Sequence, residues 1–321
     1  MSSTESLPRV AIIMTILNEE KHIEQAIGRL LKQDYLGELQ IVIAVGPSRD
    51  RTSDIVDQLV ATNARVMRVE NPSGRTPSGL NAAIAATDAE VIVRVDGHAL
   101  VPVDYVRIGV ETLNESGSDN VGGIMDAEGI TPFQRSVAAA MTSKFGVGGA
   151  AFHVGGEAGP ALTVYLGCFR RSALDRVGGY DETMIRAQDW EMNYRIRETG
   201  GTVWFTPLMK VKYRPRATAA ALAKQYFGYG TWRREVARRY PQTVSFRYLA
   251  APVMVVAVVI GVIISLFGFA IGLVPLALYA VGVIGASVIA GHGVTRLILP
   301  VVFPIMHFSW GSGFLFGRAR A

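Results

Sequence analysis

The chain has 321 residues, half of them hydrophobic, and a formal net charge of +5. It is long enough to bury a sizeable core, and its hydrophobic share is high for a wholly soluble protein. Cys168 is the only cysteine, so an intrachain disulfide is excluded. We expect this side chain to be a small buried hydrophobe rather than a catalytic thiol.

The first hundred residues alternate between apolar strands and amphipathic helices. Strands are expected at 10–17, 39–45, 65–69 and 90–95, and helices at 18–33, 50–61 and 77–86. This alternation predicts an α/β fold with a mostly parallel sheet and helices on both faces. Ligands bind at the carboxyl ends of the strands in such sheets. Asn18, Asp50 and Asp96 lie at or just after these ends.

The middle of the chain, residues 122–160, is rich in glycine and lacks clear periodicity. We expect mobile loops around a site there, and a low-complexity linker is the alternative. Aromatic, histidine and acidic residues among the glycines disfavour the linker. Further on, the pattern predicts strands at 162–169, 203–205 and 211–213, a helix at 189–199, and an amphipathic helix at 217–240.

Residues 248–295 contain no Asp, Glu, Lys or Arg. That length is about twice the ~20 apolar residues needed to cross a bilayer. Gly272 and Pro275 near its middle predict a turn between two membrane spans. A buried helical hairpin in a soluble core is the alternative. The uncharged stretch 297–316 contains prolines and glycines, which favour a re-entrant or interfacial segment with sheltered non-helical backbone over a third span.

Five arginines cluster just before the apolar stretch: Arg233, Arg234, Arg238, Arg239 and Arg247. Basic residues at this position fit the positive-inside rule and attraction to anionic lipid, so membrane lipid is a more plausible partner than nucleic acid. The short polar segment 1–8 does not resemble a signal peptide. We therefore expect a cytoplasmic catalytic domain (1–216), a juxtamembrane helix (217–247) and a multi-pass membrane domain (248–321) in the inner, plasma membrane.

Two acidic motifs carry the candidate chemistry. Asp96-Gly97-His98 follows an apolar strand, and its two metal-capable side chains can converge on Mn²⁺ or Mg²⁺ bridging a nucleotide diphosphate. A simple turn is the alternative. Asp189 lies near a predicted helix start, where it can be an N-cap, a general base for an acceptor hydroxyl, or both. Arg216 is a candidate for bidentate contact with phosphates.

Six segments occur in a suggestive order: Leu17–Glu20, Ser48–Thr52, Gly79–Ala83, Arg94–His98, Gly178–Glu182 and Gln188–Glu191. In this order they resemble family 2 glycosyltransferases of the GT-A fold. The Asp-Gly-His variant and the apolar tail are most similar to the succinoglycan glucosyltransferase (ExoA-like) subgroup. The resemblance spans essentially the whole chain and implies inverting transfer from a nucleotide-diphosphate sugar.

The resemblance also implies roles for individual residues. Asp96 matches the first acid of the family's metal motif, His98 replaces the second, and Asp189 matches the base. Nucleotide-sugar contacts are implied for Asn18, Glu20, Ser48, Asp50, Asp96 and Arg216, and acceptor contacts for Gln188, Glu191 and Trp232. The segment Val45–Pro47 stands where the family has acidic residues, one of which grips the base. UDP is favoured, and GDP and dTDP stay open.

The sequence therefore predicts a membrane-anchored inverting glycosyltransferase that acts on a lipid-linked saccharide or cell-envelope glycan. A polyprenyl-phosphate sugar synthase is the enzymatic alternative. A non-catalytic GT-A membrane scaffold is a second alternative, disfavoured by intact Asp96, His98 and Asp189. A transporter subunit is disfavoured because the predicted spans lack acidic and basic residues.

Overall fold

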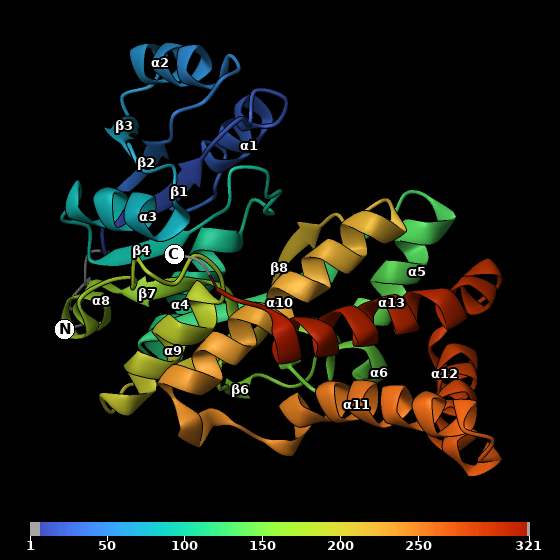
Figure 1. Ribbon diagram of the computed structural model, residues 1–321. Helices are drawn as coiled ribbons and strands as arrows, with labels where there is room; N and C mark the ends of the chain where they lie inside the picture. The colour runs from blue at the N-terminus through green and yellow to red at the C-terminus, as the bar shows by residue number, and fades with distance from the viewer. Residues whose placement is uncertain (1–6, 320–321) are drawn as a thin grey trace. The chain divides into compact units, whose positions relative to one another are not determined.

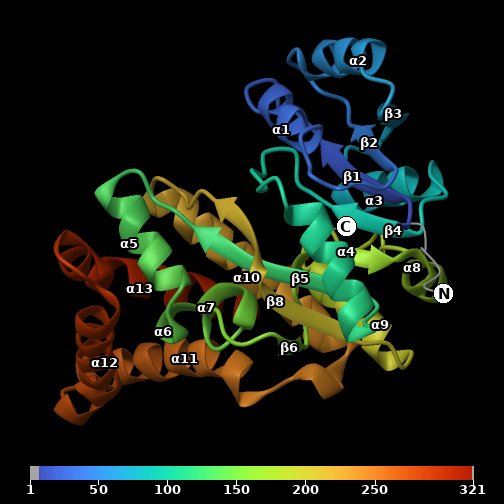
Figure 2. The same cartoon turned by 180° about the vertical axis from the view of Figure 1, so that it is seen from behind.

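The computed structural model describes residues 7–319, which form two compact units (Figures 1 and 2). Among these residues, the first unit contains 7–126 together with 155–213, and the second contains 127–154 together with 214–319. The first unit is an α/β sandwich built on a sheet, and the second is helical.

The first unit is organised around one eight-stranded sheet with the order β3-β2-β1-β4-β7-β5-β8-β6. The strands are β1 (Val10–Ile16), β2 (Leu39–Val45), β3 (Val66–Glu70), β4 (Val91–Arg94), β5 (Asn120–Ala127), β6 (Gly159–Pro160), β7 (Tyr165–Arg170) and β8 (Val203–Tyr213). β1 pairs in parallel with β2 and β4, and β2 with β3. β7 runs antiparallel to β4 and β5. The predicted α/β fold is thus confirmed, with an antiparallel extension.

Both faces of the sheet are covered because its central strands are apolar on both sides. Ile12 and Met14 of β1 face one core, and Ala11 and Ile13 face the other; all four are fully buried. The first core also contains side chains of α1 (Ile23–Leu30), α2 (Thr52–Thr62) and α4 (Tyr105–Ser116). The other face carries α3 (Thr76–Ala85), seen in front of β1 in Figure 1.

The prediction of mobile loops over 122–160 is wrong for its first half. That stretch contains most of β5 and all of α5 (Pro132–Met141), which opens with a capping box between Thr131 and Gln134. The glycines of β5 allow close approach rather than motion: a Cβ on Gly123 would lie 1.8 Å from the Met209 carbonyl oxygen. The two short strands expected at 203–213 are one continuous strand, β8. Since β6 pairs only with Trp204 and Phe205, β8 has an open edge at Pro207, where proline is tolerated.

The second unit is built around four long helices, α10 (Ala219–Arg239), α11 (Phe246–Leu266), α12 (Val274–Ala290) and α13 (Val294–Phe316). α13 packs against α10 over glycines. A Cβ on Gly230 would lie 2.0 Å from the Trp310 carbonyl oxygen, and one on Gly313 2.1 Å from that of Phe227. Such small-residue contacts let two helix backbones approach closely. Arg234 of α10 also donates to the carbonyl oxygens of Leu315 and Gly317, at 2.8 and 3.2 Å.

Three helical segments are long and apolar enough to cross a membrane: Phe246–Leu266, Ala270–Ala290 and Val294–Phe316. The expected non-helical backbone in the third is wrong, because α13 is continuous through Pro300 and Pro304. Neighbouring helices can compensate the backbone groups that a proline releases, and α5, α10 and α11 pack against α13. Three apolar helices of this length are typical of a membrane protein.

Candidate active site

Arg94 brings the two predicted acidic motifs together. It is the last residue of β4 and is only 6% exposed. Its Nη2 lies 3.2 Å from Asp96 Oδ1, and its Nη1 donates to Asp189 Oδ1. Asp96 and Asp189 are therefore held by one buried guanidinium at the carboxyl end of β4, where ligands bind in such sheets.

The charges around this guanidinium are strongly coupled. Burial works against the charged form of Arg94, but the nearby Asp189 and Asp96 carboxylates outweigh it and raise the pKa of the guanidinium. The guanidinium also lies over the Tyr180 ring, with Arg94 Cζ 5.8 Å from the ring centroid, and this contact favours the charged form. Arg94 thus stays charged and ties the two carboxylates in place.

Asp189 lies in the first turn of α9 (Gln188–Glu198), and the N-cap position belongs to Ala187. The N-cap interpretation of Asp189 is therefore wrong. Ala187 adopts a left-handed conformation, with φ of 62°, which turns the chain into the helix. Burial raises the pKa of Asp189 to about 6, although Arg94 acts in the opposite direction. A carboxylate with this pKa is ionised at neutral pH yet basic enough to accept a proton.

Four predicted nucleotide-site residues meet in two loops that follow β1 and β2. The Asn18 N–H donates to Ser48 Oγ at 3.1 Å, and Asn18 Oδ1 accepts from the Arg49 N–H at 2.8 Å. The Glu20 N–H donates to Asp50 Oδ2 at 3.2 Å. The Thr52 hydroxyl lowers the pKa of Asp50, which stays ionised. The structure thus brings these four side chains to one edge of the sheet.

His98 contacts a carboxylate that the sequence analysis did not single out. Its Nδ1 lies 3.0 Å from Glu19 Oε1. A metal-ligating histidine commonly uses its second ring nitrogen in this way, so that the carboxylate fixes its orientation. No group of three or more His, Cys, Asp or Glu residues suited to a metal occurs within residues 7–319. The predicted binding of Mn²⁺ or Mg²⁺ by Asp96 and His98 would need further ligands from water and substrate phosphates, and it stays a prediction.

The residues expected on the acceptor side have different surroundings. Glu191 is 1% exposed, and its carboxylate oxygens lie 2.6 and 2.7 Å from Arg195. Arg195 also donates to the carbonyl oxygens of Val177 and Gly179, so the pair ties α9 to the turn before it. Gln188 donates to the Ile185 carbonyl oxygen. An acceptor role for Glu191 and Gln188 stays a prediction.

Arg216 and Trp232 belong to the second unit. Arg216 is exposed, and Trp232 is 7% exposed within α10. Their predicted contacts with the nucleotide sugar and the acceptor stay predictions. Cys168 is buried in the sheet, as expected.

Asn81 connects two further motifs. Its Nδ2 donates to the Tyr180 carbonyl oxygen, its Oδ1 accepts from the Tyr180 N–H, each at 2.8 Å, and Nδ2 also lies 3.2 Å from Glu182 Oε1. The motif around residue 81 therefore positions the ring that lies beside Arg94. Sequence reasoning missed Arg94 and Glu19 as site residues. Arg94 could have been found, since residues two apart on a strand share a face.

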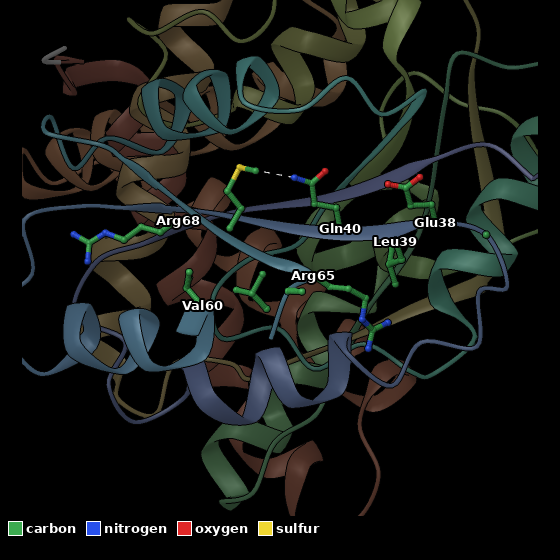
Figure 3. Close-up of a pocket in the computed structure, with 10 residues that line it drawn as sticks. Glu38, Leu39, Gln40, Val60, Arg65 and Arg68 are labelled. Atoms are coloured by element: carbon green, nitrogen blue, oxygen red, sulfur yellow. Dashed lines mark hydrogen bonds between the residues drawn. The ribbon is translucent and has the colours of Figure 1, made fainter. Parts of the chain in front are cut away.

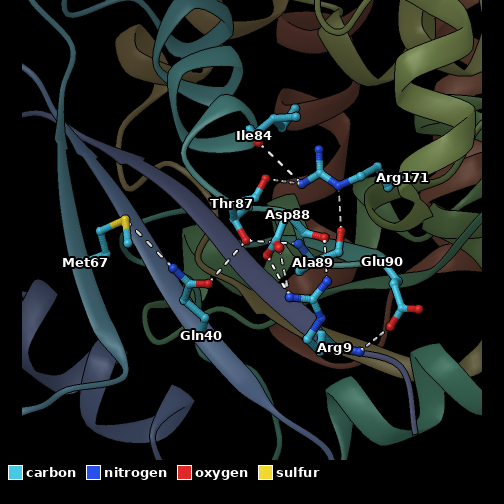
Figure 4. A network of polar contacts seen from close by, with 9 residues as sticks. All are labelled: Arg9, Gln40, Met67, Ile84, Thr87, Asp88, Ala89, Glu90 and Arg171. Carbon is cyan, nitrogen blue, oxygen red and sulfur yellow. Dashed lines mark hydrogen bonds and ion pairs between the residues drawn. The ribbon is translucent and has the colours of Figure 1, made fainter. Parts of the chain in front are cut away.

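A further hollow lies elsewhere in the first unit. A pocket of about 670 Å³ is lined by the first residues of β2 and β3, including Leu39, Gln40 and Val66 (Figure 3). It therefore opens at the amino ends of the parallel strands, away from Asp96. A polar network at the same end joins Arg9 to Asp88 at 2.9 Å and to Glu90 at 2.8 Å (Figure 4). This network holds the first strand in place and carries no catalytic arrangement.

The chain is similar to known proteins in sequence and in fold. Over its whole length the chain resembles the succinoglycan biosynthesis protein ExoA of Rhizobium meliloti, with 31% identity over 98% of this chain and 95% of that protein. A shorter stretch of 110 residues is 32% identical to beta-monoglucosyldiacylglycerol synthase of Synechocystis, covering 33% of this chain and 23% of that protein.

Among solved structures, the mannosyltransferase PcManGT of Pyrobaculum calidifontis, in complex with GDP-Man and Mn²⁺, matches with a TM-score of 0.63 and 19% identity, over 98% of this chain and 88% of that one. The S. aureus TarS fragment 1–349 with UDP-GlcNAc matches with a TM-score of 0.52 and 13% identity, over 96% and 90%. These likenesses show the GT-A fold. The family model described as glycosyl transferase family 2 matches residues 11–178, and the chain belongs to that family.

Proposed function

We propose that the protein is a membrane-anchored inverting glycosyltransferase. It moves a hexosyl unit from a nucleotide-diphosphate sugar, with UDP favoured, to a lipid-linked saccharide or cell-envelope glycan. Its catalytic unit faces the cytoplasm at the inner, plasma membrane. The observation that carries the proposal is the placement of Asp189, with a pKa of about 6, beside Asp96 through the shared Arg94.

In this proposal Asp189 accepts the proton of the acceptor hydroxyl. The acceptor oxygen forms a bond to the anomeric carbon, and the bond from that carbon to the diphosphate oxygen breaks on the opposite face, which inverts the configuration. Arg94 holds the Asp189 carboxylate in place while the proton is transferred. When bound, Mn²⁺ or Mg²⁺ at Asp96 and His98 supplies positive charge to the leaving diphosphate.

The loops after β1 and β2 bind and orient the nucleotide in this proposal. The Asn18 N–H donates to Ser48 Oγ at 3.1 Å, and the Glu20 N–H donates to Asp50 Oδ2 at 3.2 Å. These hydrogen bonds hold the two loops together before the nucleotide binds. The similar proteins support the class of donor and acceptor. PcManGT binds GDP-Man with Mn²⁺, TarS binds UDP-GlcNAc, and the relative from R. meliloti serves succinoglycan biosynthesis.

The test uses full-length protein in detergent with lipid extract from the native host as acceptor and a panel of radiolabelled nucleotide sugars with Mn²⁺. Asp189→Asn should lower transfer by roughly 10² to 10⁴-fold, the usual contribution of a general base, while nucleotide binding persists. Asp175→Asn, an exposed aspartate of α8 (Arg171–Val177), is the matched control and should leave transfer unchanged. EDTA should abolish transfer.

Retained activity in Asp189→Asn would favour a different class of acceptor. Near-normal transfer by Asp189→Asn together with an inactive Asp96→Ala would rule out Asp189 as base. It would favour a polyprenyl-phosphate sugar synthase, because a lipid phosphate acceptor is already ionised and needs little base catalysis.

A further inference from the structure

The second unit carries a large excess of positive charge. Its sequence contains two acidic residues, Glu128 and Glu235, against thirteen Lys and Arg residues. Each acidic residue already lies beside an arginine: Glu128 is 3.7 Å from Arg214, and Glu235 is 2.9 Å from Arg239. The unit itself therefore cannot neutralise its basic residues, and anions from its surroundings have to do so.

Part of this charge is concentrated around one tyrosine at the start of the first membrane helix. The Tyr248 ring has Arg233 Cζ 3.7 Å and Arg247 Cζ 4.9 Å from its centroid. Arg233 is only 8% exposed, and its Nη2 is held by the Thr243 carbonyl oxygen at 2.7 Å. Burial, and the repulsion from Arg247, lower the pKa of Arg233. Two guanidinium groups held at one ring repel each other, and a shared anion would relieve that repulsion.

The loop around α6 (Lys144–Val147) and α7 (Ala151–Val154) completes the surroundings of Arg247. Gly148, with φ of 71°, approaches so closely that a Cβ there would lie 3.0 Å from Arg247 Cδ. Burial, and to a lesser extent the charge of Arg247, lower the pKa of His153 to about 4, and its buried Nδ1 has no hydrogen-bond partner among the described residues. Three nitrogen-bearing side chains from three segments of the second unit thus gather where α11 begins.

We propose that Arg233, Arg247 and His153 form a binding site for the phosphate group of a membrane lipid. Guanidinium groups bind phosphate oxygens through paired, charge-assisted hydrogen bonds. Arg247 is exposed, and its Nη2 donates to the Tyr248 hydroxyl oxygen at 2.9 Å. The N-terminus of α11 at Phe246 adds a favourable dipole for an anion. The inference rests on the proposed function in one respect: the lipid that the site would hold during catalysis is the lipid-linked acceptor.

Two lipids share this chemistry, and the experiment separates them. Full-length protein in neutral detergent is titrated with polyprenyl diphosphate, phosphatidylglycerol or phosphatidylcholine, and native mass spectrometry measures the bound fraction. We expect Arg247→Gln to weaken binding of the phosphate lipid by roughly tenfold or more, since it removes a charge-assisted contact. Arg233→Lys keeps the charge but loses the planar group, and should weaken binding as well. Arg238→Gln removes one exposed charge of the same helix and is the matched control.

The pattern of losses decides the outcome. Preferential binding of polyprenyl diphosphate that disappears in Arg247→Gln identifies the acceptor as the ligand, whereas equal binding of both anionic lipids identifies the bulk headgroup. Equal losses in Arg247→Gln and Arg238→Gln, or no loss in either, would overturn the site, because the attraction would then be diffuse or absent. Asp189→Asn should bind lipid normally, so a failure of the proposed catalytic base leaves this test intact.

Discussion

Arg94 shares one positive charge between two carboxylates, and this sharing controls how readily Asp189 binds a proton. Burial raises the pKa of Asp189, Arg94 lowers it, and Asp96 raises it. A backbone hydrogen bond from Leu166 lowers it further, and the pKa of about 6 is the balance of these four effects. Removing any one of them shifts the pH at which the base becomes active.

The pH dependence of transfer follows from this balance. Only the ionised form of Asp189 can accept the acceptor proton, so turnover should be low in acid, rise as the pH passes about 6, and level off above it. The rate of transfer at saturating donor and acceptor, measured from pH 5 to pH 8.5 at constant ionic strength, checks the position of this rise.

A pair of Arg94 variants serves as the control. Arg94→Met removes the cation that favours ionised Asp189, so the rise should move to higher pH, while Arg94→Lys should keep most of the original profile. Thermal unfolding of both variants shows whether each is folded. A rise at the same pH in wild type and Arg94→Met would mean that Asp189 is not the titrating group.

At the residue scale, the sequence indicated which side chains are candidates for catalysis, but it did not indicate which residues those side chains contact. Asp96 and Asp189 could be selected from their motifs, and the structure places them on one guanidinium. The pairing of Glu191 with Arg195 was not anticipated, although the two lie one helical turn apart. The contact between Glu19 and His98 depends on how two strand-end loops meet, which local sequence does not specify.

Among the secondary-structure elements, α10 and α13 approach each other closely through their backbones. Gly230 and Gly313 make it possible, since any Cβ there would overlap a carbonyl oxygen of the other helix. The contact has a direct energetic consequence, because overlap with backbone cannot be relieved by a side-chain rotation.

Two glycine-to-alanine substitutions should act in opposite directions. Gly230→Ala forces α10 and α13 apart and should lower the midpoint of thermal unfolding. Gly285→Ala in α12 has nothing within 4 Å of the added Cβ, so it should raise or preserve the midpoint through helix propensity worth roughly 0.5–1 kcal/mol. Tryptophan fluorescence during heating of the detergent-solubilised protein measures both. A Gly230→Ala protein as stable as wild type would show that the two backbones are not in close contact.

Glycine also explains why the prediction of mobile loops over 122–160 failed in its first half. Glycine in a sequence is compatible both with a flexible loop and with a backbone that must approach another closely. Gly122 and Gly123 belong to the second kind, but the neighbouring strand that makes this clear, β8, lies some eighty residues later. The strands β1, β2 and β4 were predictable because each is short and predominantly apolar.

For the whole molecule, the contact between Arg234 and the end of α13 constrains membrane topology. The chain leaves α10, runs through α11, α12 and α13, and returns to α10 at Leu315 and Gly317. α10 carries six charged residues and is not itself a span. A chain that returns to its starting side crosses the membrane an even number of times. At most two of the three apolar helices can therefore be single membrane crossings. α13 has the lowest mean hydropathy of the three, 1.4 against 2.8 and 2.2, so we propose two crossings and an interfacial α13.

Cysteine labelling tests this topology. Arg238→Cys in α10 and Arg318→Cys after α13 should both resist an impermeant maleimide in intact cells and both react after permeabilisation. The native Cys168 is buried and should give little background. Labelling at position 318 but not at position 238 in intact cells would establish a third crossing and place the C-terminal end outside.

The division into two units was the least accessible feature of the whole molecule. The α/β unit could be anticipated from chain order, and the apolar helices from composition. The second unit, however, recruits residues 127–154 from the middle of the chain. Contacts between α5 and α13 bring about this recruitment, and they join segments whose local sequences show no relation to each other.

The glycine contact between α10 and α13 also has a consequence in time. Arg234 and its acceptor Gly317 are 83 residues apart in the chain. At roughly 5–20 residues per second, synthesis takes about 4 to 17 seconds to cover that distance. During this interval α10 has left the ribosome without the helix that covers its glycine face, while two apolar helices still have to enter the lipid. The second unit can therefore close only after its last helix has been made, and a ribosome stalled before Val294 would hold a chain whose α10 is still uncovered.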